Sequence, residues 1–267
     1  MKAAAIQMTS GRSVERNLRD AEDHLADARR QGAELVVLPE NFAFLGADDA
    51  ERLSVSEEWR SGPVQDFLSA QATRHEIWLV GGTVPIRHGD KAHSASLLIR
   101  PDGEVVARYD KVHLFDVSIP GADEVYLESA TTIAGEEPVV AATPFGRIGL
   151  SICYDLRFPR LFERLSSMGM EILVLPAAFT VPTGEAHWRV LLRARAIETQ
   201  SFVLAAAQVG EHESGRQTYG HSLIVDPWGD VLAEKNTGPG VIVTNLDMMR
   251  LNQIRETFPV LDHRRDF

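Results

Sequence analysis

Short apolar runs alternate with amphipathic segments along the whole chain. Apolar runs of about four to eight residues bounded by Gly, Pro or Asp are typical of buried strands. Segments in which apolar residues recur every three or four positions are typical of helices with one buried face. The pattern predicts strands at residues 3–8, 35–38, 77–82, 172–175, 202–208 and 241–246, and helices at 14–30, 64–75, 161–168, 188–199 and 248–257.

Three further pairs of expected strands are separated by proline and glycine residues. Proline presets φ and glycine accepts positive φ, so Pro-Asp-Gly at 101–103, Pro-Phe-Gly at 144–146 and Pro-Trp-Gly-Asp at 227–230 indicate tight turns. The hairpins that these turns predict join residues 94–100 to 104–110, 139–143 to 147–152, and 222–226 to 231–234.

The order of these elements predicts the class of fold. Helices between strands indicate parallel pairs and hairpins indicate antiparallel pairs, so the sheets should be mixed. About a dozen strands exceed what one open sheet usually holds, whereas two packed sheets with helices outside would use them all. No linker, low-complexity tract or repeat divides the chain. We therefore predict a single α/β domain over residues 1–267 with two central sheets.

Composition narrows the class of partner. The 267 residues carry 27 Lys and Arg against 38 Asp and Glu, a net charge of −11, so nucleic acid and anionic membranes should be repelled. The first eight residues lack a signal-peptide core, and no apolar stretch approaches the length of a bilayer. A single cysteine excludes an intrachain disulfide framework and fits a reducing compartment. We expect a cytoplasmic protein that binds neither nucleic acid nor membrane.

That single cysteine is the first candidate for chemistry. Cys153 ends the apolar run at 147–152 and precedes a turn into a helical pattern. A thiol at a strand-to-helix turn is exposed at the end of a sheet, with backbone N–H groups directed at the atom it attacks. The alternative is a small buried hydrophobe, and position alone does not decide between the two.

Two charged residues also stand where strands end. Glu40 follows the apolar run at 35–38 and Pro39, which cannot continue a strand because it fixes φ and lacks a donor. Lys111 follows the strand expected at 104–110. Each has an ordinary alternative: Glu40 could be a solvated loop acid, and Lys111 a surface lysine or the partner of Asp110.

Taken together, these three residues resemble the Glu–Lys–Cys triad of the nitrilase superfamily of carbon–nitrogen hydrolases. The three motifs follow the order of that family and read Leu38-Pro-Glu40, Tyr109-Asp-Lys111 and Ile152-Cys-Tyr-Asp155. The resemblance spans nearly the whole chain and is tightest after Lys111, where the sequence is most similar to the branch of amidases that act on deaminated glutathione. The stretches that carry it are residues 113–121, 153–159, 186–200, 219–222, 226–229 and 263–265.

The resemblance implies a fold and a mechanism. The fold is a four-layer αββα sandwich of two mixed sheets flanked by helices. Cys153 is the nucleophile and forms a thioester, Glu40 is the general base, and Lys111 with the backbone N–H of Tyr154 stabilises the oxyanion. A second acid, Glu128, holds Lys111 or helps to place the substrate. Neither a metal nor an organic cofactor is implied, and a homodimer is expected through helices near the cysteine.

The substrate is expected to be an amide of a small 2-oxo acid. Arg157 could clamp a carboxylate in bidentate geometry, or could pack against Asp155 instead. Residues 180–184 are expected as a loop, where the Thr183 hydroxyl and the following helix N-terminus could bind an anion. Glu185 stands where relatives usually have Pro, which puts a negative charge beside that anion site.

Deaminated glutathione is the leading substrate, with 2-oxoglutarate and cysteinylglycine as the products. The alternatives are an omega-amidase that acts on 2-oxoglutaramate or succinamate, and a binding or scaffold protein that has lost catalysis. A redox-sensing Cys153 would need a resolving thiol from another chain.

The nine histidines raise the question of a metal or of a Cys–His pair. No His-x-x-x-His or Cys-x-x-Cys spacing occurs, so a zinc site is not expected. His113, His187 and His221 fall in the matched stretches, where a structural hydrogen bond is the favoured role. A papain-like pairing of one of them with Cys153 stays open, but it would leave Glu40 and Lys111 without a purpose.

Overall fold

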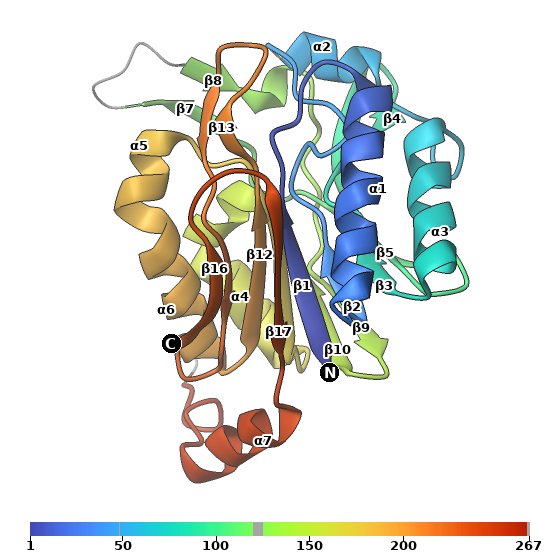
Figure 1. Cartoon of the computed structure of the whole chain (residues 1–267). Helices are drawn as coiled ribbons and strands as arrows, with labels where there is room; N and C mark the ends of the chain where they lie inside the picture. Colours follow the sequence, from blue (N-terminus) through green and yellow to red (C-terminus); the bar gives the residue numbers. More distant parts are fainter. Residues whose placement is uncertain (48, 120–124, 266–267) are drawn as a thin grey trace.

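Two large sheets packed between helices make up the part of the chain that the computed structural model describes, residues 1–47, 49–119 and 125–265 (Figure 1). The helices are α1 (Val14–Arg30), α2 (Asp49–Ser54), α3 (Pro63–His75), α4 (Pro159–Ser167), α5 (Val181–Thr183), α6 (Arg189–Thr199) and α7 (Met248–Thr257).

Both large sheets are mixed, as the alternation of crossovers and hairpins predicted. The first has the order β17 (Gly240–Asn245), β1 (Lys2–Gln7), β2 (Leu35–Val37), β3 (Trp78–Val80), β5 (Lys91–Ile99) and β4 (Val84–His88), with β6 (Val105–Asp110) also paired to β5. The second has the order β16 (Val231–Lys235), β15 (Ser222–Val225), β12 (Phe202–Ala207), β11 (Ile172–Ala177), β10 (Gly146–Leu150) and β9 (Val139–Thr143). Two small sheets pair β7 (Asp116–Ser118) with β8 (Val125–Leu127), and β13 (Val209–Glu211) with β14 (Gln217–Tyr219).

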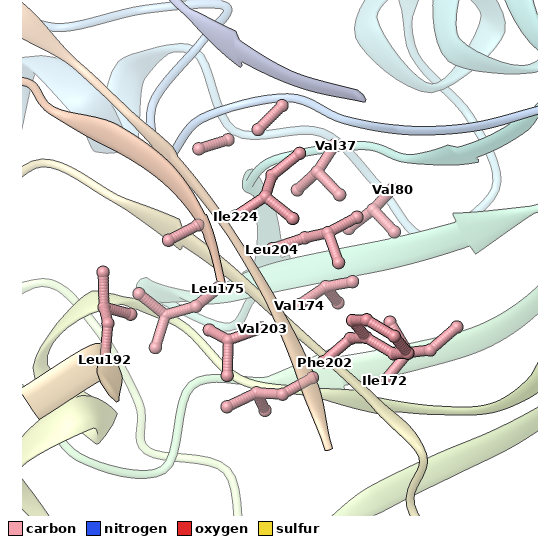
Figure 2. Close-up of a cluster of buried hydrophobic side chains, with 14 of the residues drawn as sticks. Val37, Val80, Ile172, Val174, Leu175, Leu192, Phe202, Val203, Leu204 and Ile224 are labelled. Atoms are coloured by element: carbon pink, nitrogen blue, oxygen red, sulfur yellow. The ribbon is translucent and has the colours of Figure 1, made fainter. Parts of the chain in front are cut away.

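Apolar side chains from the facing sheets form the central core (Figure 2). Val37 and Val80 of the first sheet share one buried cluster with Leu204 and Ile224 of the second. Val36, which precedes Val37, belongs instead to a cluster with residues of α1 and α3. Successive side chains of a strand point to opposite faces, so a strand that is apolar at every position can supply both clusters.

Helices cover the outer faces of both sheets. The buried residues of α1 include Ala21, Leu25 and Ala28, which recur at helical spacing, and the Ser13 hydroxyl caps its N-terminus by accepting from the Arg16 N–H. Helices α1 and α3 lie over the first sheet, and α4 and α6 over the second (Figure 1). The expected four-layer αββα arrangement is confirmed. That residues 1–267 form one domain stays a prediction.

The sequence analysis missed short elements and misplaced one helix start. It did not find α2, β4, β7, β8, β13 or β14, because strands of three to five residues and a six-residue polar helix carry too little periodicity. Residues 180–184, expected as a loop, are mostly helical: α5 continues through a π-turn at Gly184–Trp188 directly into α6. Pro182 fits the first helical turn, where its missing N–H needs no partner.

The start of this helix is packed tightly against β14. A Cβ on Gly184 would lie 2.2 Å from the Tyr219 ring, so the residue there must lack a side chain.

No helix within the described ranges is long and apolar enough to cross a bilayer.

Candidate active site

A pocket opens where strands of both sheets end, and the three residues singled out from the sequence all line it. Glu40 follows β2, Lys111 follows β6 and Cys153 follows β10. The pocket has about 500 Å³ of empty space, a figure that includes open solvent at its mouth. Its other lining residues are Asn41, Arg52, Phe115, Tyr126, Glu128, Tyr154, Arg157, Ala178, Phe179, Thr183 and Arg216.

The backbone around Glu40 is held by contacts from both sheets. Gly82 adopts a φ of 55°, and a Cβ there would lie 2.2 Å from the Pro39 carbonyl oxygen, so the chain can pass this close only with glycine. The buried Gln208 side chain donates to the Glu40 carbonyl oxygen at 3.0 Å. The Glu40 side chain is itself buried, so it is not a solvated loop acid.

Lys111 lies between two carboxylates. Its Nζ donates to Glu40 Oε1 and to Glu128 Oε2, both at 2.9 Å, and the side chain is buried. Burial by itself would lower the pKa of Lys111, but the negative charges of Glu128 and Glu40 raise it above its ordinary value. The side chain is therefore an ammonium at neutral pH. Asp110 pairs with Arg108 at 2.8 Å, so the expected alternative partner of Lys111 is occupied elsewhere.

The Glu128 carboxylate is the second acid in contact with Lys111. Its Oε2 accepts from Lys111 and, at 2.8 Å, from the backbone N–H of Phe115. Arg52 lies 3.7 Å from its Oε1. Burial would raise the pKa of Glu128, but Lys111 and Arg52 lower it, so the group is a carboxylate.

Cys153 sits in strained backbone at the start of a 3₁₀ turn (Cys153–Arg157). Its φ of 46° is in the left-handed region, which costs a non-glycine residue roughly 1–3 kcal/mol and persists only where neighbours impose it. Asp155 supplies that constraint. Its carboxylate accepts from the Ile152 N–H at 2.9 Å, from the Tyr109 hydroxyl at 2.7 Å and from the His113 N–H at 3.1 Å.

The surroundings of the Cys153 thiol favour its protonated form. Burial and the nearby Glu40 carboxylate raise the pKa of Cys153 well above its ordinary value, and Lys111 opposes them only in part. The Glu40 carboxylate raises the pKa of the thiol, and the Ala178 backbone N–H lowers it. Cys153 is therefore protonated at rest, beside a carboxylate that can accept the proton.

Arg157 and Thr183 both line the pocket. The Arg157 guanidinium lies over the Phe179 ring, 5.1 Å from its centroid, and its Nη1 is 3.0 Å from His187 Nδ1. Arg157 does not pack against Asp155 as the alternative expected. The Asp155 carboxylate instead accepts the three hydrogen bonds described above. The Thr183 hydroxyl is 2.8 Å from the Thr180 hydroxyl, inside the first helical turn. Glu185 is exposed and does not line the pocket.

Several lining residues were missed from sequence. Arg52 and Arg216 come from a short polar helix and from the polar loop between β13 and β14, where an arginine is usually a surface residue. Every residue except proline has a backbone N–H, so the sequence does not reveal that the one at Ala178 lies in the pocket. A basic residue in an acidic chain was the only available signal for the two arginines. Residues 120 and 121, which end one of the matched stretches, lie outside the described residues.

Histidines take structural positions, and none is among the described lining residues of the pocket. His113 Nδ1 lies 2.7 Å from Asp155 and its ring stacks on Phe158 at 3.8 Å, while His221 Nδ1 lies 2.9 Å from Glu234. The papain-like pairing with Cys153 therefore lacks a histidine at the required place. Within the described ranges, no three His, Cys, Asp or Glu side chains cluster closely enough to hold a metal ion.

This geometry supplies what acyl transfer through a thiol requires. A thiol, a buried carboxylate and a buried ammonium line one small pocket. The role of the Tyr154 N–H as an oxyanion donor stays a prediction.

Comparison with known proteins shows relatives over the full length. The sequence model of the carbon-nitrogen hydrolase family matches residues 2–256. The deaminated glutathione amidase of Synechocystis sp. is 46% identical over 98% of this chain and 97% of its own. The crystal structure of the C. elegans NitFhit protein is 40% identical, with a TM-score of 0.91, over 99% of this chain and 65% of that longer chain.

A structure with chemistry at its cysteine is also similar. The amidase from Nesterenkonia sp. AN1, solved as a point mutant after Michael addition of acrylamide at its active-site cysteine, is 27% identical with a TM-score of 0.81. The match covers 97% of this chain and 98% of that one.

Proposed function

This chain belongs to the carbon-nitrogen hydrolase family, and from that premise we propose that it is an amidase that hydrolyses deaminated glutathione to 2-oxoglutarate and cysteinylglycine. The observation that carries the proposal is that Lys111 donates to the buried Glu40 carboxylate in the same pocket that Cys153 lines. The name of the Synechocystis relative supports the choice of substrate.

The first step is attack by the thiol. Glu40 takes the Cys153 proton as the sulfur bonds to the amide carbon, and base catalysis of this kind typically contributes roughly 10²–10⁴ in rate. The carbonyl oxygen becomes an oxyanion beside the Lys111 ammonium, with the Tyr154 N–H as the proposed second donor. Lys111 contacts two carboxylates, and protonation of Glu40 neutralises one of them just as the oxyanion forms. The Lys111 ammonium can therefore stabilise the new negative charge more strongly.

The second half of the reaction reuses the same groups. Glu40 returns its proton to the nitrogen of the leaving amine, the carbon–nitrogen bond breaks, and the acyl group remains on Cys153 as a thioester. Glu40 then takes a proton from water, whose oxygen attacks the thioester carbon. The carbon–sulfur bond breaks, 2-oxoglutarate is released, and Glu40 returns the proton to the Cys153 sulfur. Glu128 keeps the Lys111 ammonium in place through both halves.

Charge in the pocket favours an anionic substrate. The whole chain has a net charge of −11, yet the described lining residues include four cationic side chains and two acidic ones. We propose that Arg157 binds the carboxylate of the 2-oxo acid, with the Thr183 hydroxyl as a further donor. The omega-amidase alternative, with 2-oxoglutaramate or succinamate as substrate, would use the same acyl site.

Release of 2-oxoglutarate from deaminated glutathione tests the proposal, with 2-oxoglutaramate measured in parallel. We expect turnover of deaminated glutathione with the higher kcat/KM, and a loss of roughly 10³-fold or more in Cys153→Ala, because the thioester cannot form. A preference for 2-oxoglutaramate would favour the omega-amidase. No turnover of any amide by the folded wild type would favour the inactive binding protein.

A further inference from the structure

We propose that Arg216 binds the carboxylate of the leaving group, in an outer subsite that adjoins the catalytic pocket. This proposal deepens the proposed function and depends on it. It assigns to this chain a means of selecting an amide whose amine half ends in a carboxylate, here a dipeptide, over amides that release ammonia.

A second cavity continues outward from the catalytic pocket. The two share Asn41, Arg52, Tyr126 and Arg216 as lining residues, whereas Cys153 and the proposed acyl-site residues line only the inner one. Apolar side chains such as Phe44, Leu45 and Val125 supply much of the outer lining. Arg52 and Arg216 are the only charged side chains among the described residues of this outer cavity, and both are cationic. A ligand segment that is uncharged along its length and ends in a carboxylate would complement this outer cavity.

Of these two cations, Arg216 is the one with a guanidinium N–H donor that can bind a ligand. Its Nη2 donates to the Ala178 carbonyl oxygen at 3.1 Å, and its guanidinium lies 5.0 Å from the centre of the Tyr126 ring. Its Nε is buried and has no hydrogen-bond partner among the described residues. A buried donor without an acceptor is costly, and a guanidinium oriented by a ring and a carbonyl is suited to bidentate binding of a carboxylate. Arg52, in contrast, bonds to Thr132 and lies near Glu128.

The position of Arg216 matches the length of the leaving group. Ala178 lines the catalytic pocket together with Cys153, and its carbonyl oxygen accepts from Arg216, so the guanidinium is held beside the pocket that contains the nucleophile. An extended dipeptide places its terminal carboxylate roughly 7 Å from its amino nitrogen. Cysteinylglycine leaving from an acyl group on Cys153 can therefore reach the junction of the two cavities.

Three substrates separate this role from others. They are deaminated glutathione, the same molecule with its terminal carboxylate converted to a carboxamide, and 2-oxoglutaramate. In the wild type we expect kcat/KM for the carboxylate form to exceed that for the carboxamide form by roughly 10- to 100-fold, the usual scale of a charge-assisted hydrogen-bond pair. In Arg216→Met this preference should disappear, and in Arg216→Lys, which keeps the charge but loses the fork, part of it should remain.

The controls keep structural damage apart from loss of binding. Arg87→Met removes an arginine that is 40% exposed and outside both cavities, and should keep the wild-type preference. Equal kcat/KM for the carboxylate and carboxamide forms in the wild type would overturn the proposal without any variant. So would an equal loss on all three substrates in Arg216→Met. Failure of the wild type to hydrolyse any of the three would instead remove the proposed amidase function, and the present proposal with it.

Discussion

At the scale of single residues, pairing between a few buried charges determines the protonation states in the site. Lys111 contacts two carboxylates, and Arg52 lies near the second, so opposite charges balance among side chains that are largely buried. Buried charges are tolerated only when they are paired and hydrogen-bonded. Cys153 stays protonated in this setting because a third negative charge would be costly.

Replacement of Glu40 by Gln tests this balance. We expect kcat to fall by roughly 10²–10⁴ because the base is lost. Removal of the negative charge should also lower the pKa of the Cys153 thiol, so the pH profile of its iodoacetamide alkylation should shift to lower pH than in the wild type.

Glu58→Gln serves as the matched control, since the Glu58 side chain is 72% exposed and outside the pocket. Wild-type turnover in Glu40→Gln would contradict the proposed base. An alkylation profile that moves to higher pH would contradict the charge coupling between Glu40 and Cys153.

At the scale of elements, short connections rather than long helices orient the pocket walls. The β13–β14 hairpin, which carries Arg216 in its loop, is tied to the start of the chain through His212. The His212 Nδ1 lies 2.8 Å from the Ser10 carbonyl oxygen and its Nε2 lies 2.7 Å from the Thr218 hydroxyl. The side chain is buried, and burial lowers its pKa below the ordinary 6.5.

This lowered pKa predicts a pH-dependent stability. Below about pH 6.5 the unfolded chain binds a proton at His212 more readily than the folded chain does. The contribution of this residue is therefore complete above pH 6.5 and is lost as the pH falls through the lower pKa of the folded state. We expect Tm to fall with pH in this window, and less so in His212→Gln.

His263→Gln is the appropriate comparison, because His263 is exposed. Thermal unfolding of the three proteins between pH 7.5 and pH 5 measures the effect. Parallel pH profiles for the wild type and His212→Gln would show that another group is responsible.

At the scale of the whole molecule, we predict a homodimer that buries the outer face of α6. Val190 and Ile197 lie on that helix with 68% and 48% of their surfaces exposed, although its opposite face packs on the second sheet. Exposed apolar side chains of this kind are typical of subunit contacts. Light scattering coupled to size exclusion should give about twice the 29.5 kDa chain mass.

A double substitution, Val190→Glu with Ile197→Glu, should return the mass to that of a monomer, since two buried negative charges in each subunit would face one another. Leu232→Glu provides a control on a half-exposed apolar residue of β16. A monomeric wild type, or a dimer unaffected by the double substitution, would refute this interface.

Much of the fold and part of the site could be predicted before any coordinates. The long elements followed from periodicity, and Glu40, Lys111 and Cys153 stood out because each interrupts the chain where an apolar strand ends. Glu128 was identified through the family resemblance alone, and Arg216 was not identified from the sequence. A polar loop between two three-residue strands has no local pattern that distinguishes a pocket arginine from a surface one.

The order of side chains by itself determined the helices, the strands, the mixed sheets and the places where chemistry could begin, because hydrophobic periodicity and turn chemistry act over a few residues. Only the tertiary structure decided which strand ends meet. Glu40 and Lys111 are 71 positions apart, and their 2.9 Å contact depends on sheet order and packing. The same packing buries the thiol in the pocket that Glu40 lines, and that burial raises the pKa of Cys153 well above its ordinary value.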